Sequence, residues 1–202
     1  MRRTKAEAEE TRAKLLDVAE HLFFELGVSA VTFDRIAAAA GVTRGAIYWH
    51  FANKAELLLA LDELTTLPAE EMLVLSRETK PERPLDFVCE VARQCLHIIA
   101  RDERRQRIYT ILFRCDYHGE LAELLKRDRE TTQRHFGQLL EFFELAREKG
   151  QLAAHWKPET AVRTFQWSVT GLLFEWLKDR DAFDFVGDGE DMLRALLQSW
   201  SA

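Results

Sequence analysis

Helical periodicity is the feature that most limits what this chain of 202 residues can fold into. Apolar residues recur every three or four positions along most of the sequence, as they do on one face of an α-helix. The first such stripe comprises Leu15, Val18, Ala19, Leu22, Phe23 and Leu26. Alternating runs of Val, Ile and Thr between turns, which would indicate strands, are nearly absent. The sequence therefore predicts an all-α protein of about nine helices.

Capping residues divide the first part of the chain into short helices. Gly27 is placed to end the first helix, because glycine readily adopts the left-handed conformation found at helix C-termini. Thr32, Thr43 and Asn53 are placed to cap the second, third and fourth helices, since their side chains can accept bonds from the first free N–H groups. We therefore expect a three-helix N-terminal domain over residues 1–56.

Longer helices are expected in the rest of the chain, and a larger domain at 57–202. Pro84 and Pro158 fit first-turn positions, and Gly150 fits a C-terminal stop. A kink is expected at Pro68, because proline removes a hydrogen bond inside a helix. The helices are expected at about 54–78, 84–101, 104–117, 121–149, 158–180 and 188–200.

Composition excludes several classes of protein. Apolar residues make up 47% of the chain, which argues against disorder, yet none of their runs approaches the roughly 20 residues of a membrane span. The N-terminus is charged and lacks the apolar stretch of a signal peptide, so we expect a cytoplasmic protein without membrane contact. Cys89, Cys95 and Cys115 form no metal-ligand spacing and are expected to be buried, reduced thiols. No metal or cofactor is expected.

Charge is unevenly distributed. The net charge is −6, but residues 1–56 hold eight Lys or Arg and eight Asp or Glu, so the acidic excess lies wholly in 57–202. No acidic residue occurs between Asp34 and Glu56. Arg2, Arg3 and Lys5 precede any acid and are either a DNA-contacting arm or ordinary solvated charges. A local positive surface near the N-terminus is consistent with nucleic-acid binding.

Residues 33–51 have the pattern of a helix-turn-helix. The motif needs a small residue at the helix crossing, a glycine in the turn and an apolar residue facing inward from the second helix, and Ala37, Gly41 and Ile47 meet these needs. A bare helical hairpin has the same spacing. The remaining residues favour DNA binding, because packing does not explain an outward group of basic and aromatic side chains on one short helix. That group is Arg44, Gly45, Tyr48, Trp49 and His50.

The run Thr43-Arg-Gly-Ala-Ile-Tyr-Trp-His-Phe-x-Asn-Lys54 resembles the signature of the TetR family of repressors. It is most similar to the branch that regulates multidrug efflux, typified by the acridine-resistance repressor. The resemblance extends upstream through Glu10-Thr-Arg-x2-Leu-x-Asp-Val-Ala19. Downstream it is recognisable in Asp102-Glu-Arg-Arg, Ile111-Leu-Phe and Gly171-Leu-Leu-x2-Trp-Leu177. It implies a dimeric repressor of a pseudo-palindromic operator, with a larger C-terminal domain that binds an effector.

The resemblance also implies roles for single residues. Arg44 and Gly45 are expected to read bases, because an arginine can bond to guanine O6 and N7 while a glycine permits close approach. Phosphate contacts are expected from Thr43, Tyr48, His50 and Lys54, the last at a helix N-terminus. Trp49 has two interpretations: stacking against DNA or packing against the first helix.

The family fold surrounds an internal cavity, and nine of the thirteen phenylalanines lie in 57–202. Most aromatics at helical spacing simply belong to the core, but a lipophilic, cationic drug also suits aromatic walls. The candidates for the cavity lining are Phe113, Phe136, Leu139, Phe143, Phe165 and Gln166. Asp116 is a candidate partner for a cationic drug, and the alternative is a surface Asp beside Arg114.

Two apolar stripes near the C-terminus predict the dimer interface. Each stripe must also serve the core of its own chain, but an otherwise exposed Trp200 fits a four-helix interface between two copies. The candidates are Phe165, Val169, Leu172, Trp176, Leu193, Leu196, Leu197 and Trp200.

A ligand-responsive repressor is therefore the expected function. An enzyme is disfavoured, because the sequence has no phosphate-binding glycine loop, metal-ligand cluster or nucleophile elbow, and no catalytic residue is proposed. A DNA-binding or architectural protein without a ligand is the alternative, and activation in place of repression is compatible with the same sequence.

Overall fold

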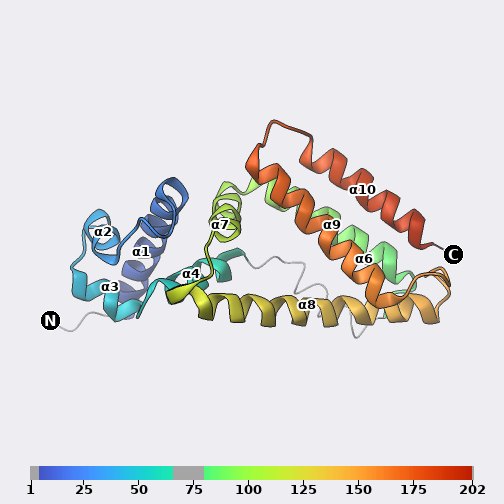
Figure 1. The fold of residues 1–202 in the computed structure, drawn as a ribbon, viewed down its shortest axis with the longest axis horizontal. Helices are drawn as coiled ribbons and strands as arrows, with labels where there is room; N and C mark the ends of the chain where they lie inside the picture. The colour runs from blue at the N-terminus through green and yellow to red at the C-terminus, as the bar shows by residue number, and fades with distance from the viewer. Residues whose placement is uncertain (1–4, 66–79, 202) are drawn as a thin grey trace. The chain divides into compact units, whose positions relative to one another are not determined.

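The computed structural model describes residues 5–65 and 80–201, which form nine α-helices and two short 3-10 helices (Figure 1). Within them, β-pairing is limited to one isolated antiparallel bridge between Leu152 and Ser201. The predicted all-α fold is confirmed. The helices are α1 (Lys5–Leu26), α2 (Phe33–Ala39), α3 (Arg44–His50), α4 (Lys54–Asp62), η1 (Glu63–Thr65), α6 (Pro84–Arg101), α7 (Glu103–Phe113), η2 (Gly119–Leu121), α8 (Ala122–Glu148), α9 (Pro158–Lys178) and α10 (Phe185–Trp200).

The short N-terminal helices begin and end where local chemistry predicts. Thr32 Oγ1 accepts from Arg35 N and Thr43 Oγ1 from Ala46 N, each at 3.2 Å. Asn53 Oδ1 accepts from Glu56 N at 2.9 Å. Gly27 follows α1 at φ +80°, a conformation that suits glycine. The three predicted caps and this predicted stop are confirmed.

The predicted helix 104–117 ends early, at Phe113. The backbone N–H groups of residues 114 and 115 turn back onto i−3 carbonyls, which tightens the last turn. The Tyr117 hydroxyl then donates to the Leu112 carbonyl at 2.8 Å. That side-chain bond satisfies a carbonyl which a further helical turn would have used. The α-helix predicted at 54–78 ends at Asp62 and continues as the 3-10 helix Glu63–Thr65, while residues 66–78 and the kink predicted at Pro68 lie outside the described residues.

The described chain divides into two compact units. Among the described residues, the first unit contains 5–65 and 104–128, and the second contains 80–103 and 129–201. The first unit thus extends beyond the predicted domain 1–56, because α7 packs with the N-terminal helices. Glu20 of α1, which is fully buried, is bonded by Arg104 Nε at 2.7 Å and by Arg107 Nε at 2.8 Å.

The second unit is built around α6, α9 and α10, which lie side by side (Figure 1). Gly189 of α10 permits the close approach, because a Cβ there would lie 2.6 Å from Leu96 Cδ1 and 3.0 Å from Leu172 Cδ2. Trp176 stacks on Phe185 with 4.3 Å between ring centroids. These contacts bury apolar surface, which is the main stabilising term in such a helical layer. None of the described helices is both long and apolar enough to cross a membrane.

Candidate nucleic-acid interface

Three side chains hold the helix-turn-helix together. Ile36 and Ile47 are fully buried and Ala37 is 2% exposed, so α2 and α3 pack through the positions that the motif predicts. Gly41 adopts φ +64° in the turn, and Val42 N donates to Ala37 O at 3.0 Å. α3 buries Ile47 alone, so the rest of this helix projects away from the core.

The outward surface of α3 carries large side chains. Trp49 is 73% exposed and Tyr48 49% exposed, while Thr43, Arg44 and Gly45 are also exposed. Trp49 meets the His50 ring edge to face, with centroids 4.6 Å apart. Its exposure rules out burial against α1, one of the two interpretations left open by the sequence. Exposed aromatics cost free energy in water, so their presence here favours a contact surface.

Arg44 has two neighbours at the start of α3. Its Nε lies 3.2 Å from Asp34 Oδ1 of α2, and its Cζ lies 5.6 Å from the centroid of the Tyr48 ring. Tyr48 in turn packs edge to face on Phe33, at 5.2 Å between centroids. The side chain predicted to read bases therefore has one acidic and one aromatic neighbour.

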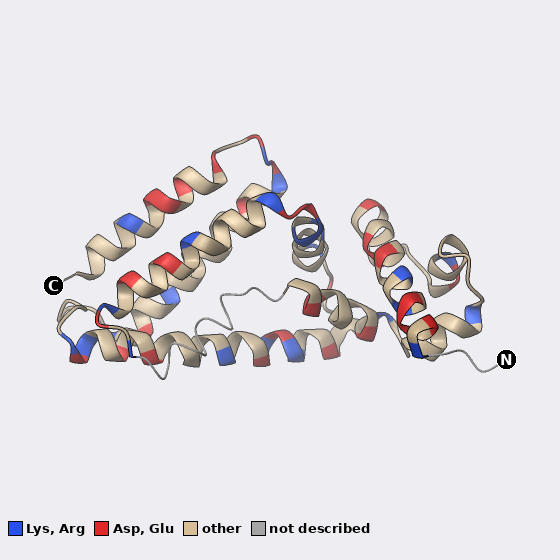
Figure 2. Cartoon of the chain, turned by 180° about the vertical axis from the view of Figure 1, so that it is seen from behind, with Lys and Arg blue, Asp and Glu red and all other residues tan. Residues whose placement is uncertain are grey.

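Lys54 stands at the first position of α4, as expected. It is half-buried, and its Nζ donates to the Val28 carbonyl at 3.3 Å. An ammonium group has three N–H donors, of which this bond uses one. In Figure 2, α3 shows basic and no acidic colouring. Lys5 is exposed and lies 3.9 Å from Glu9, whereas Arg2 and Arg3 lie outside the described residues.

The effector candidates belong to both compact units. Phe113 and Asp116 lie in the first, where Phe113 is half-buried and stacks with Tyr109. Asp116 is 81% exposed and pairs with His118, which holds the pKa of the carboxyl below its usual range. This environment favours the surface interpretation of Asp116 over a buried partner for a cation.

The other five effector candidates lie in the second unit. Phe143 is fully buried and Phe165 is 7% exposed, and both pack on Trp200, with centroids 5.1 and 6.2 Å away. Leu139 is buried as well, while Gln166 is half-buried. Phe136, also half-buried, lies under the Arg163 guanidinium at 4.7 Å. The structure thus brings Phe143 and Phe165 together through Trp200, as part of the core.

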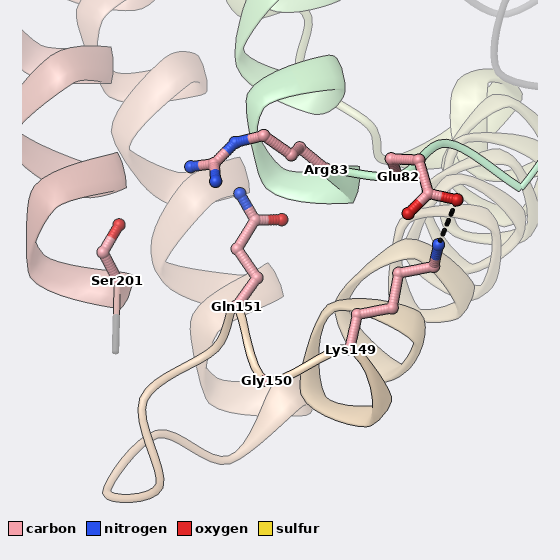
Figure 3. A pocket seen from close by; sticks show the side chains of 6 residues that line it. All are labelled: Glu82, Arg83, Lys149, Gly150, Gln151 and Ser201. Carbon is pink, nitrogen blue, oxygen red and sulfur yellow. Dashed lines mark ion pairs between the residues drawn. The ribbon is translucent and has the colours of Figure 1, made fainter.

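A pocket of about 200 Å³ opens in the second unit, and its lining contains none of the residues predicted to line an effector cavity (Figure 3). Figure 3 shows Arg83 and Gln151 toward Ser201, with the Lys149–Glu82 ion pair at the other side. Lys149 Nζ lies 3.2 Å from Glu82, and Arg83 Nε lies 2.7 Å from Asp86. Its walls are polar and its cations are paired, so it does not match an aromatic effector site. The described residues include no group of His, Cys, Asp and Glu that could hold a metal ion.

Comparison with known proteins decides the family. Residues 15–61 match the bacterial regulatory proteins of the tetR family, and residues 83–201 match the C-terminal region of MAATS-type transcriptional repressors. The chain belongs to the TetR family. It is therefore a DNA-binding transcriptional repressor and not an enzyme, and the resemblance seen in the sequence is confirmed.

Individual TetR-family proteins are similar over nearly the whole chain. The HTH-type transcriptional repressor BepR of Brucella suis is 36% identical, covering 100% of this chain and 97% of its own. NalD, the secondary repressor of the MexAB-OprM multidrug efflux pump in Pseudomonas aeruginosa, superposes with a TM-score of 0.89 at 32% identity, covering 98% of each chain. SmeT of Stenotrophomonas maltophilia, in complex with triclosan, has a TM-score of 0.84 at 30% identity, covering 96% of this chain and 92% of its own.

For this TetR-family chain, one expectation about the dimer interface is wrong. Trp200 is fully buried within its own chain and is not an exposed C-terminal anchor. Phe165, Trp176 and Leu193 are also buried within the chain. The half-buried members of the predicted stripes are Val169, Leu172, Leu196 and Leu197.

A second stripe on α9 was not predicted from the sequence. Trp167 is 68% exposed and Phe174 37% exposed, with the exposed Gly171 between them. Their spacing of i, i+4 and i+7 is itself a helical signal, but it lies beside the stronger core stripe. Asp34, which lies beside Arg44, was not predicted either, although it is the last acid before a long acid-free segment of the sequence.

Proposed function

We propose that the chain is a ligand-responsive repressor of a multidrug efflux operon, acting in the cytoplasm on a pseudo-palindromic operator. The observation that carries the proposal is the exposed, acid-free surface of α3, with Arg44, Tyr48 and Trp49 facing away from the core. The efflux target rests on the similarity to NalD, the secondary repressor of the MexAB-OprM multidrug efflux pump. The proposed domains are 1–56 for DNA binding and 57–202 for effector binding and dimerisation.

The proposed residue roles on DNA are compatible with the exposed positions on α3. Arg44 and Gly45 at its N-terminus would meet base edges, since the start of a recognition helix enters the major groove first. Phosphates would be met by Thr43, Tyr48, His50 and Lys54. Trp49 would lie against the sugar-phosphate surface or a thymine methyl, because its ring is available to solvent.

A second copy of the chain would supply the helix-turn-helix for the other half of the operator. Two helix-turn-helix motifs related by a two-fold axis at a fixed separation require an isologous interface, which uses the same patch on both copies. We propose the exposed face of α9 around Trp167, Gly171 and Phe174, together with the half-buried Leu196 and Leu197 of α10. Exposed tryptophan and phenylalanine on one helix face are typical of a protein–protein interface.

The effector would be a lipophilic molecule held in the larger domain. SmeT has been crystallised with triclosan, a lipophilic compound, which supports this class of ligand. The side chain of Gln138 on α8 offers a polar group, because its buried Oε1 has no hydrogen-bond partner among the described residues. A buried acceptor without a partner costs free energy, and a ligand hydroxyl would relieve that cost. Gln138 thus joins the aromatic candidates.

Operator binding with and without ligand tests the proposal. The DNA would be the inverted repeat found upstream of the gene, compared with a random duplex of equal length by fluorescence anisotropy. We expect a clear preference for the repeat, and a 5–150-fold loss of operator affinity in saturating triclosan, the usual range for allosteric coupling. By linkage, triclosan must bind the operator complex more weakly by the same factor.

Two results would contradict the proposal. Equal affinity for the repeat and the random duplex would favour an architectural DNA-binding protein. Operator binding that no compound of a lipophilic panel weakens would remove the effector part and leave the DNA-binding part.

A further inference from the structure

An acidic side chain of α2 lies beside the first residue of α3. Asp34 lies in the first turn of α2, and its Oδ1 is 3.2 Å from Arg44 Nε. Both side chains are well exposed, at 58% and 69%. No further acid follows until Glu56, so Asp34 is an isolated negative charge beside a surface that must approach phosphates. Such a charge is repelled by DNA of any sequence.

Arg44 has one neighbour on α2 and one on its own helix, α3. Asp34 lies beside its guanidinium, and the Tyr48 ring lies 5.6 Å from its Cζ. Tyr48 is fixed in turn by the buried Phe33, the residue adjacent to Asp34. Thr32 caps the first turn of α2, which carries both Phe33 and Asp34.

The contact with Nε suits the recognition of guanine. A guanidinium reads O6 and N7 with two parallel N–H donors. The Asp34 carboxylate lies 3.2 Å from Nε, and the two terminal Nη groups can supply those donors. An arginine held so loses less side-chain freedom on binding a base than a fully mobile one.

We propose that Asp34 is a positioning residue that sets the base specificity of Arg44. This inference rests on the proposed function, in which Arg44 reads bases. Repulsion from Asp34 weakens binding to every sequence, whereas its support of Arg44 is useful only where a guanine receives the guanidinium. Asp34 therefore raises the ratio of operator to random-DNA affinity without adding a contact of its own.

The test is a double-mutant cycle on Asp34→Asn and Arg44→Ala, with affinities measured on the operator and on a random duplex. Asp34→Asn should lower the ratio of operator to random affinity about two- to fivefold, the range expected for one exposed charge pair. In the Arg44→Ala background the same change should leave the ratio unaltered. Asp181→Asn is the matched control, because it removes one exposed carboxylate from the second unit and leaves the helix-turn-helix intact.

Each outcome decides the proposal. An equal rise in affinity for both duplexes would make Asp34 a repulsive charge only and would overturn it, as would a fall in the ratio that persists without Arg44. A rise in the ratio would show that Asp34 competes with DNA for Arg44, and also overturns it. If the wild-type protein does not prefer the operator to the random duplex, the proposed function itself is wrong. Thermal melting of each variant checks that the domain remains folded.

Discussion

Two tryptophans show how the environment of a residue decides its role. Trp49 on α3 is 73% exposed, whereas Trp200 at the end of α10 is fully buried. The Trp200 ring packs on Phe143 and Phe165, and its Nε1 has no hydrogen-bond partner among the described residues. Burial of so large a ring is a major stabilising contribution, whereas the exposed ring contributes little to the fold. The first is therefore available to DNA, and the second belongs to the core.

Alanine replacement should separate these roles. Trp200→Ala should lower the free energy of unfolding by about 3–5 kcal/mol, the usual cost of deleting a buried aromatic. Trp49→Ala should change it by less than about 0.5 kcal/mol, as for most surface positions, yet weaken operator binding. Urea denaturation and anisotropy on the same samples measure both effects. A Trp49→Ala protein that is destabilised like Trp200→Ala would mean that Trp49 is a packing residue.

Two thiols, the buried Cys89 and the half-buried Cys115, give a second prediction for single residues. Burial, with a smaller effect of the nearby Asp86, raises the pKa of Cys89 to about 12, and burial raises that of Cys115 to about 11. Because the thiolate is the reactive form, both should resist iodoacetamide at pH 8 in the native state. Denaturation in urea, which restores ordinary thiol pKa values, should make them react. Since the unfolded thiols ionise near pH 9, stability should also fall as the pH rises above 9 toward 12. Rapid native labelling of Cys89, located by mass spectrometry, would contradict the assignment.

Element boundaries could be predicted from sequence wherever neighbours along the chain determine them. Thr32, Thr43 and Asn53 each bond a backbone N–H three residues ahead, so a short sequence window contains the whole interaction. The buried Glu20 could not be foreseen, because its partner Arg104 lies 84 residues away. On sequence alone Glu20 is one of many charged residues of α1. Only the pairing of α1 with α7 makes its burial possible.

Removal of the Glu20 carboxylate tests that pairing. Glu20→Ala should lower the free energy of unfolding by about 2–4 kcal/mol, because Arg104 and Arg107 lose a charged acceptor. The cost stays below that of a fully buried triad, since the two arginine side chains are 44% and 22% exposed and can meet water. Glu25→Ala, at an exposed position of the same helix, is the control and should be nearly neutral. Equal urea midpoints for both variants would show that the buried pair contributes nothing.

At the scale of the whole molecule, sequence periodicity could not assign apolar stripes to the core or to a partner. α9 is apolar on two faces: Phe165 and Trp176 are buried in the chain, whereas Trp167 and Phe174 remain exposed. Both stripes have helical spacing, and burial depends on which face α10 covers. The same ambiguity led to the wrong expectation for Trp200. The outward face of α3 was easier to predict, because basic and aromatic residues on so short a helix had no packing explanation.

The dimer interface is tested by a charge on the exposed stripe. Trp167→Glu should preserve the fold, since the side chain is 68% exposed, but it would place a carboxylate at the centre of the proposed apolar contact. In an isologous interface both copies carry the substitution in the same patch, so two like charges come together. We expect monomers in light scattering and the loss of operator binding, because a single helix-turn-helix contacts only half of the operator. Thr132→Glu adds the same charge at an exposed position of α8 and should remain a DNA-binding dimer. A Trp167→Glu protein that still forms a dimer with wild-type operator affinity would place the interface on another surface, and the half-buried Leu196 and Leu197 of α10 would be the next positions to change.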